Sequence, residues 1–239
     1  HDVDPIDLII VDATGDGSLT EFIVSDMFTA NTSDNTFILG TDNSVGETLI
    51  GNSGHDLIFA NAGDDTLSGG AGDDTLRGGD GNDTISGGSD STPNTAGSGN
   101  DLIYGEAGND TIFGGDGNDT IFGGLGDDTI NGGLNADTIS GGTGDDTLSG
   151  GADNDQMTGG DGVDTFKVDA GTDTITDLGG TAGGQTDVLI VSNGATANAT
   201  NIANFTAGST TKNQGTANLT TKVDGGTIDV GASVTGAYN

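Results

Sequence analysis

A nine-residue unit repeats almost without interruption between residues 51 and 176. Its form is Gly-Gly-x-Gly-x-Asp-x-apolar-x, and the plainest copy occupies residues 114–122. The aspartate recurs in thirteen copies, and every step is nine residues except that from Asp83 to Asp101, which is eighteen. A short, fixed period is typical of stacked coils and argues against a globule with a single core.

Each unit is expected to turn over six residues and to run straight over three. Glycine at positions one, two and four reaches backbone angles that other residues adopt only with strain. The last three residues alternate Thr, an apolar residue and an outward residue, which predicts a very short strand with its middle side chain buried. Two units then form one coil of eighteen residues, so odd and even units stack into two parallel sheets.

The aspartates predict what stabilises these coils. One buried apolar side chain per unit offsets only part of the entropy lost when nine residues are ordered. Aspartates eighteen residues apart lie one above another, and their charges would repel. A hard divalent cation held by carboxylates and backbone carbonyls removes that repulsion and adds its binding energy to folding. Six or more oxygens on flexible turns suit Ca²⁺ better than Mg²⁺, which demands tight octahedral geometry.

The candidate carboxylate ligands are the sixth residues of the units. They are Asp56, Asp65, Asp74, Asp83, Asp101, Asp110, Asp119, Asp128, Asp137, Asp146, Asp155, Asp164 and Asp173.

This repeat resembles that of the repeats-in-toxin (RTX) calcium-binding proteins, whose signature is this nonapeptide. The resemblance implies an all-β fold, a right-handed parallel β-roll with non-repeat β caps at both ends and rows of Ca²⁺ between adjacent turns. About ten such ions would neutralise most of the net charge of −34.

The resemblance also implies how each ion is held. One turn supplies the carbonyls of positions two and four and its Asp, and the turn two units later supplies the carbonyls of positions one and three and its own Asp. One ion would lie among Gly115, Gly117, Asp119, Gly132, Leu134 and Asp137, and the next, across the roll, among Gly124, Gly126, Asp128, Gly141, Thr143 and Asp146.

The same mapping yields the other backbone ligands. At positions two and four they are Asn52, Gly54, Asn61, Gly63, Gly70, Gly72, Gly79, Gly81, Gly99, Gly108, Gly133, Asn135, Gly142, Gly144, Gly151 and Asp153. At positions one and three they are Gly69, Ala71, Gly78, Asp80, Gly105, Ala107, Gly114, Asp116, Gly123, Leu125, Gly150, Ala152, Gly159, Asp161, Val168 and Ala170.

Some copies depart from the pattern. Asn135 and Asp153 replace the glycine at position four, but both residue types tolerate left-handed angles, so these sites are expected to persist. The opening glycine pair is replaced at residues 60–61 and 168–169, so weaker binding is expected at both ends of the array.

Residues 90–98 leave two interpretations open. They are one period long, but they put Pro93 where a strand should run, and proline cannot donate to the ladder. If they loop out, Asp74 partners Asp101 and Asp83 partners Asp110. If they form a degenerate turn, Asp83 partners Asp101 instead.

Charge and composition exclude several classes of function. Thirty-eight acidic against four basic residues argue against binding nucleic acid or inserting into an anionic membrane. The absence of cysteine excludes disulfides, and the sequence shows neither a signal peptide nor a membrane span. The chain begins with His1, so we expect a fragment of a longer protein.

We expect three domains: a cap or linker at residues 1–45, the β-roll at 46–178 and a small β cap or connector at 179–239. Strands are expected at residues 8–11, 36–39, 47–50, 187–191, 202–205, 219–223 and 227–230, and a strand or short helix at 22–24. Residues 12–23 open like an EF-hand loop but end in Ile23, so a simple turn and an extra Ca²⁺ site both stay open. Residues 168–200 resemble connectors between RTX arrays in bacterial, notably cyanobacterial, surface proteins.

No catalytic site is expected. The only histidines are His1 and His55, and His55 falls at an exposed turn position, so neither a zinc protease nor a Ser-His-Asp hydrolase is supported. Phe59, Tyr104, Phe113 and Phe122 occupy the outward ninth position. They are expected either to stiffen the sheets as a ladder or to contact another protomer or a cell-surface partner.

The resemblance implies a calcium-binding structural module of a secreted bacterial surface protein, S-layer-like or an adhesin. Such a module folds on extracellular Ca²⁺ after type I secretion in the unfolded state. The alternative is an accessory module of a secreted protease, lipase or polysaccharide epimerase, and sequence beyond the two ends would discriminate between them.

Overall fold

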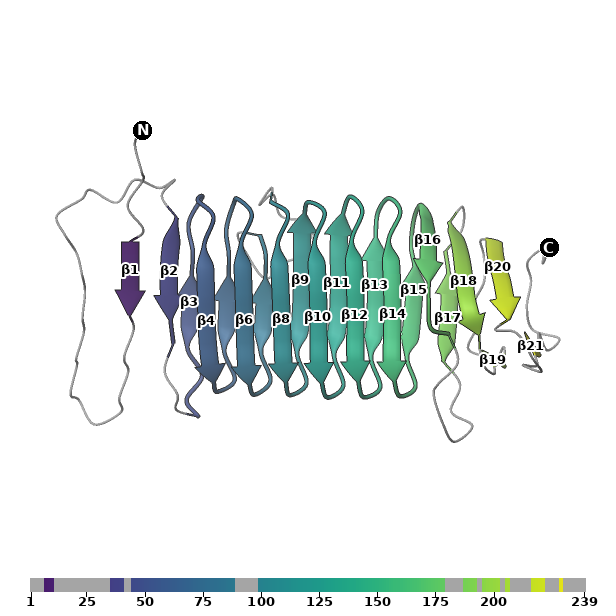
Figure 1. The fold of residues 1–239 in the computed structure, drawn as a ribbon, viewed down its shortest axis with the longest axis horizontal. Helices are drawn as coiled ribbons and strands as arrows, with labels where there is room; N and C mark the ends of the chain where they lie inside the picture. Colours follow the sequence, from purple (N-terminus) through teal and green to yellow (C-terminus); the bar gives the residue numbers. More distant parts are fainter. Residues whose placement is uncertain are drawn as a thin grey trace.

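The computed structural model describes residues 7–10, 35–40, 44–88, 99–178, 187–192, 195–202, 205–206, 216–221 and 228–229. Within these ranges all regular structure is β, and the strands stack into a parallel solenoid of about seven turns (Figure 1). The all-β roll with non-repeat caps is therefore confirmed. These ranges contain no helix that is long and apolar enough to cross a membrane.

Two parallel sheets form the walls of the roll, and strands alternate between them along the chain. Sheet A is ordered β1 (Asp7–Ile10), β2 (Thr36–Leu39), β4 (Leu57–Ala62), β6 (Thr75–Asp80), β8 (Leu102–Ala107), β10 (Thr120–Leu125), β12 (Thr138–Thr143), β14 (Gln156–Asp161), β16 (Thr172–Ile175), β18 (Thr196–Ile202) and β20 (Thr216–Thr221). Sheet B is ordered β17 (Val188–Val191), β15 (Thr165–Val168), β13 (Thr147–Gly151), β11 (Thr129–Leu134), β9 (Thr111–Asp116), β7 (Thr84–Ser86), β5 (Thr66–Ser68) and β3 (Thr48–Ile50). A separate parallel pair joins β19 (Phe205–Thr206) to β21 (Ile228–Asp229).

The strands are longer than the three residues that the repeat predicts. In the middle of the array they span six residues, as in β10 and β12. The pairing of Ile121 with Ile139 continues through the glycines to Leu125 and Thr143. The expectation of six turning residues is therefore wrong, because backbone pairing between coils carries the ladder over positions one to three of the next unit.

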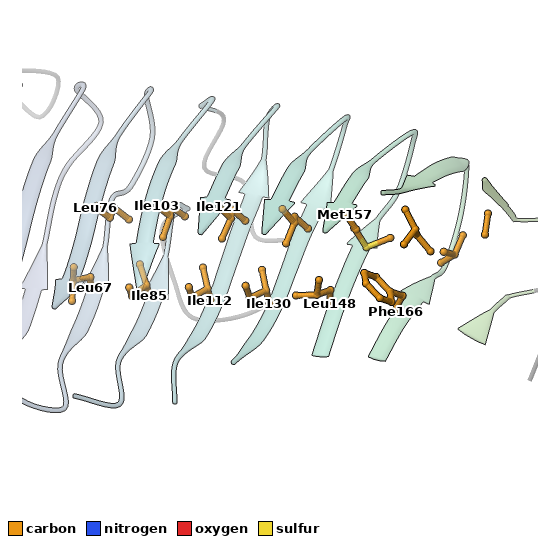
Figure 2. Close-up of a cluster of buried hydrophobic side chains, with 14 of the residues drawn as sticks. Leu67, Leu76, Ile85, Ile103, Ile112, Ile121, Ile130, Leu148, Met157 and Phe166 are labelled. Atoms are coloured by element: carbon orange, nitrogen blue, oxygen red, sulfur yellow. The ribbon is translucent and has the colours of Figure 1, made fainter. Parts of the chain in front are cut away.

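The core consists of two facing rows of single apolar side chains (Figure 2). Sheet A contributes a row that includes Leu76, Ile103, Ile121 and Met157, and sheet B one that includes Leu67, Ile85, Ile112, Ile130, Leu148 and Phe166. Each of these side chains is almost completely buried. The eighth position of the repeat thus supplies most of the apolar interior of the array, as the alternating pattern predicts, and Ala60 and Val168 add to it from position one.

The register around residues 90–98 distinguishes the two interpretations of that segment. Strand β6 pairs with β8 and places Thr75 opposite Leu102, while β7 pairs with β9 and places Thr84 opposite Thr111. These offsets are 27 residues, and the backbone N–H of Asp74 accordingly donates to Asp101 Oδ1 at 2.7 Å. The pairing of Asp74 with Asp101 and of Asp83 with Asp110, which the looped-out interpretation predicts, is therefore confirmed, whereas residues 90–98 themselves lie outside the described residues.

At the ends, the strands expected near residues 8–11, 36–39, 47–50, 187–191, 219–223 and 227–230 correspond to β1, β2, β3, β17, β20 and β21. The strand expected at 202–205 does not match one element, because β18 ends at Ile202, β19 begins at Phe205 and belongs to another sheet, and residues 203–204 lie outside the described residues. Sheet A therefore continues through β18 and β20 after the last repeat. The element expected at 22–24 and the EF-hand-like loop at 12–23 lie outside the described residues.

Aromatic and cationic side chains form a ladder on the outer face of sheet A. The rings of Tyr104 and Phe122 stack with centroids 5.1 Å apart and planes 10° apart, as their spacing of eighteen residues predicts. Arg77 lies between Phe59 and Tyr104, with its guanidinium 5.8 Å and 5.5 Å from the two ring centroids, and it pairs with Glu106. Because these side chains contact one another along the stack, their packing supports the interpretation that they stiffen the sheet.

A second ladder runs along the turns, through the fifth residue of each unit. The Oδ1 atoms of Asn100, Asn109 and Asp127 each accept the backbone N–H of the fifth residue in the next coil, at 2.8–2.9 Å. His55 is exposed as expected, and its Nδ1 accepts the N–H of Asp73. The fifth position was predicted only to be an exposed turn position, but its Asx side chains also form hydrogen bonds from coil to coil.

Candidate metal centres

The sixth-position aspartates form two rows, one at each turn edge of the roll. All thirteen are buried, each with at most 3 % of its surface exposed. One oxygen of each is used within the protein: Asp137 Oδ1 accepts the N–H of Asp119 and Asp146 Oδ1 that of Asp128, both at 2.8 Å. This bond repeats between all eleven neighbouring pairs of the thirteen.

The other carboxylate oxygen has no hydrogen-bond partner in most of the array. Buried Oδ2 atoms without a partner belong to Asp65, Asp74, Asp83, Asp110, Asp119, Asp128, Asp137, Asp146, Asp155, Asp164 and Asp173. A buried, unsatisfied carboxylate oxygen is costly unless a cation compensates it. Its repetition in every coil indicates a binding group that each coil needs.

Each Oδ2 faces a small space that is lined by backbone. A Cβ atom placed on Gly123 would lie 2.3 Å from Asp128 Oδ2 and 2.6 Å from the carbonyl oxygen of Gly141 in the next coil. Gly114 stands in the same relation to Asp119 and Gly132, at 2.3 Å from both oxygens. Glycine at position one therefore keeps open the space where these two oxygens converge, which a side chain at Gly114 or Gly123 would fill.

The carbonyls of positions two and four face the same interval between coils. A Cβ on Gly142 would lie 2.1 Å from the oxygen of Gly124, and one on Gly144 would lie 2.1 Å from that of Gly126. The Thr143 carbonyl also borders this interval and accepts the N–H of Gly126 at 2.7 Å. The structure thus gathers at one interval the six residues that the repeat assigns to the ion at Asp128 and Asp146.

Replacement residues at these positions keep the geometry. Asn135 and Asp153 at position four have φ angles of 76° and 75°, so they adopt the left-handed conformation that the sequence analysis expects of them. At position two, Asn61 and Glu106 do the same, with φ angles of 77° and 84°. The carbonyl directions of the turns therefore survive the loss of glycine.

Burial raises the pKa of the twelve carboxyl groups from Asp65 to Asp173 above 3.8, the backbone N–H bonds that they accept lower it in part, and the charges of neighbouring carboxylates raise it further. The pKa rises to about 8 for Asp101 and Asp137, to about 7 for Asp74, Asp83, Asp146 and Asp173, and to about 6 for Asp110, Asp119, Asp128, Asp155 and Asp164. Without a cation, the folded roll therefore takes up protons near neutral pH.

A pH dependence follows from these shifts. Because the folded-state pKa lies above the unfolded value of 3.8, the stabilisation is complete below pH 3.8 and is lost as pH rises through about 6 to 8. We expect the calcium-free chain to gain β-type circular dichroism as pH falls from 8 to 4. With saturating calcium the carboxylates are ionised in both states, so the signal should stay constant between about pH 5 and 8. A calcium-free signal that does not change with pH would contradict this account.

The donor set favours a hard cation that binds mainly to backbone. Among the described residues, no three His, Cys, Asp or Glu side chains converge on one point. Each interval instead offers two carboxylates with backbone carbonyls around them, an all-oxygen set on turns. Such a set fits Ca²⁺, with its six to eight oxygen ligands in flexible geometry, and does not fit Zn²⁺.

The comparison with protein families agrees with this geometry. The profile of the RTX calcium-binding nonapeptide repeat matches four times, at residues 42–76, 60–91, 95–130 and 131–166. Together the matches cover just over half of the chain. The chain belongs to this RTX family. A search of curated proteins found no matching relative.

Membership of the RTX family makes this chain a calcium-binding structural module. RTX repeats are typical of secreted proteins. A bound Ca²⁺ would supply positive charge where two buried carboxylates meet. The turns of the protein position the carboxylate and carbonyl oxygens around it.

One part of an RTX site was missed by the sequence analysis. A Cβ on Gly87 would lie 2.1 Å from Asp101 Oδ2 and 2.4 Å from the carbonyl oxygen of Gly114. Gly87 thus fills position one of the unit that Gly99 and Asp101 complete on the far side of the insertion. The signal was available, because residues 87–88 are a Gly-Gly pair in the phase of the repeat.

A second candidate ligand that the sequence analysis did not predict, Glu47, lies in the first coil of sheet B. The N–H of Glu47 donates to Asp65 Oδ1 at 2.7 Å, the bond that an aspartate makes elsewhere in the row. A Cβ on Gly40 would lie 2.5 Å from both Glu47 Oε2 and the carbonyl oxygen of Ala60. Residues 46–49 are a weak copy of the second half of the repeat unit. Glu47 therefore holds the sixth position of this unit, and its longer side chain reaches the same space.

Proposed function

We propose that this chain is a structural module of a secreted bacterial surface protein, S-layer-like or an adhesin, that folds on extracellular calcium after unfolded type I secretion. The observation that carries the proposal is the row of buried aspartates whose Oδ2 atoms have no partner in the protein. Each needs a cation, and the cation must arrive after the chain has left a compartment that lacks it.

The ligands that we propose are the carboxylates and carbonyls assigned by the repeat, with one ion in each interval between aspartates eighteen residues apart in the stack. Eleven hydrogen-bonded aspartate pairs mark such intervals among the thirteen residues, close to the ten ions expected. We also retain the three domains, with the roll at residues 46–178 between a cap and a connector.

The mechanism is binding coupled to folding. In cytosol with little free calcium, acidic repeats repel one another and stay unfolded, which suits passage through a secretion channel. Extracellular modules of this kind bind calcium at about 10⁻⁴–10⁻³ M. At that concentration the roll folds progressively from a capped end, because each coil contacts only its neighbours. The module has no enzymatic activity of its own in this proposal and contributes a rigid, extended element.

A calcium titration tests the proposal when it is followed both by circular dichroism and by sedimentation velocity. We expect a cooperative gain of β-structure at a calcium concentration of about 10⁻⁴–10⁻³ M. Over the same range the sedimenting particle should become more compact than the unfolded chain while staying elongated. A chain that is already folded at cytosolic calcium levels would contradict export in the unfolded state. Self-association on calcium addition would indicate that the module also joins protomers.

Magnesium provides a stringent comparison. We expect Mg²⁺ at equal concentration to leave the chain unfolded, because it holds its waters tightly and demands near-ideal octahedral geometry that the curled turns do not offer. Circular dichroism with sodium chloride at matched ionic strength separates specific binding from charge screening. Folding by Mg²⁺ to the same extent would overturn the assignment of Ca²⁺.

A further inference from the structure

The buried aspartates that precede the strands of sheet B form a row, and this row continues one coil beyond Asp164, its last member within the repeats. The backbone N–H of Asp164 donates to Asp187 Oδ1 at 3.0 Å, across 23 residues instead of eighteen. The N–H of Val188 donates to the Asp164 carbonyl at 2.7 Å, just as that of Thr147 donates to the Asp128 carbonyl at 2.8 Å. Strands β15 and β17 pair with Thr165 opposite Val188. Asp187 therefore takes the sixth position of the next coil.

The interval between these two aspartates contains an unsatisfied buried oxygen. Asp164 is 1 % exposed, and its Oδ2 has no hydrogen-bond partner. A Cβ on Gly159 would lie 2.1 Å from that oxygen, as one on Gly141 lies 2.3 Å from Asp146 Oδ2 one coil earlier. Asp164 Oδ2 thus lies against the position-one glycine of its own unit, as Asp146 Oδ2 does inside the array.

Backbone oxygens complete the comparison. Gly160 and Gly162, at positions two and four of the same unit, have φ angles of 114° and 146°, close to the 122° and 127° of Gly142 and Gly144. One coil earlier, the carbonyl oxygens of Gly142 and Gly144 face the next coil, at 2.0 and 1.9 Å from a Cβ placed on Gly160 and Gly162. Because Gly160 and Gly162 hold the same positions of the repeat, we expect their carbonyls to face the coil of Asp187.

The electrostatic surroundings also need a cation. Asp187 is 3 % exposed, so two buried carboxylates are stacked at this end. The other row ends differently, because Asp173 pairs with Ala197, which has no carboxylate.

We infer that a further Ca²⁺ site lies between Asp164 and Asp187 and is completed by the carbonyls of Gly160 and Gly162. The inference rests on the proposed calcium-dependent function, and Asp187 lies outside the matched repeats, which end at residue 166. The ion fastens β17, whose Leu189 and Val191 are buried, to the end of the array. The ion thereby stabilises the C-terminal end of the roll through β17, whose residues no longer follow the repeat.

The test is the number of calcium ions bound per folded chain, counted by native mass spectrometry and by equilibrium dialysis. We expect Asp187→Asn to bind one ion fewer than the unmodified chain, because asparagine still accepts the Asp164 N–H but lacks the charge. The matched control is Asp145→Asn, which removes a nearby exposed charge and keeps the bond from Val163 N–H to Oδ1. Asp145→Asn should bind the full number.

An unchanged count in Asp187→Asn would overturn the inference while leaving the calcium-dependent function intact, whereas no binding by the unmodified chain would overturn both. If Asp187→Asn does not fold, anomalous diffraction from the unmodified chain crystallised in calcium decides the question. We expect an ion about 2.3–2.6 Å from oxygens of both Asp164 and Asp187. Water in that position would refute the site.

Discussion

Chelation of calcium at neutral pH is expected to abolish the β-type circular dichroism and to expand the chain. Every coil buries two aspartates, and at pH 7.5 most of these carboxylates would be ionised without compensation in a calcium-free roll. The apolar core cannot offset this cost, because each unit buries only one side chain such as Ile121 or Ile130. The expected effect is the loss of the whole fold rather than of its ends.

The measurement pairs circular dichroism with small-angle scattering, since the first reports strands and the second compaction. Addition of calcium in excess over the chelator should restore both signals, which serves as the control for irreversible damage. A dichroism signal that survives excess chelator at pH 7.5 would contradict coupled folding. The same experiment at pH 4 should retain more structure, because protons replace the cation on the buried carboxyl groups.

Replacing Asp128 by alanine is expected to raise the calcium concentration at the folding midpoint strongly and to reduce the steepness of the transition. Asp128 lies mid-array, its Oδ2 lacks a partner, and its Oδ1 accepts the N–H of Asp110. The change therefore removes a ligand from two neighbouring intervals and a charge-assisted hydrogen bond of about 1.5–3 kcal/mol. Because coils stabilise only their neighbours, a defect in the middle divides the stack into two shorter arrays.

The matched variant is Asp56→Ala at the edge. Both oxygens of Asp56 are already occupied, by the N–H groups of Thr36 and Asn52 at 2.6 Å. Its loss leaves the rest of the array contiguous, so we expect a smaller shift of the midpoint and an almost unchanged slope. Equal effects of the two substitutions, in titrations followed by circular dichroism, would indicate independent sites.

Much of the fold and of the candidate site could be predicted from spacing alone. An eighteen-residue coil with one apolar residue per half-turn admits only two facing rows, and the structure places Ile112 and Ile121 in them. The same spacing predicted that Asp128 lies one coil below Asp146, and the resemblance to the RTX repeat implied that Gly124 and Gly126 face the interval between them. These relations depend on short-range periodicity, so no long-range information was needed.

Tertiary pairing was needed wherever the period fails. The Gly-Gly pair at residues 87–88 is in phase with the repeat, but the 27-residue offset of β6 against β8 was needed to decide that Gly87 and Asp101 belong to one unit. Likewise, only the pairing of β15 with β17 places Asp187 above Asp164. Where the nine-residue period is unbroken, it determines which residues stack on one another. Across an insertion the period is lost. The stacking partner then depends on backbone hydrogen bonds and buried contacts between segments that are distant along the chain.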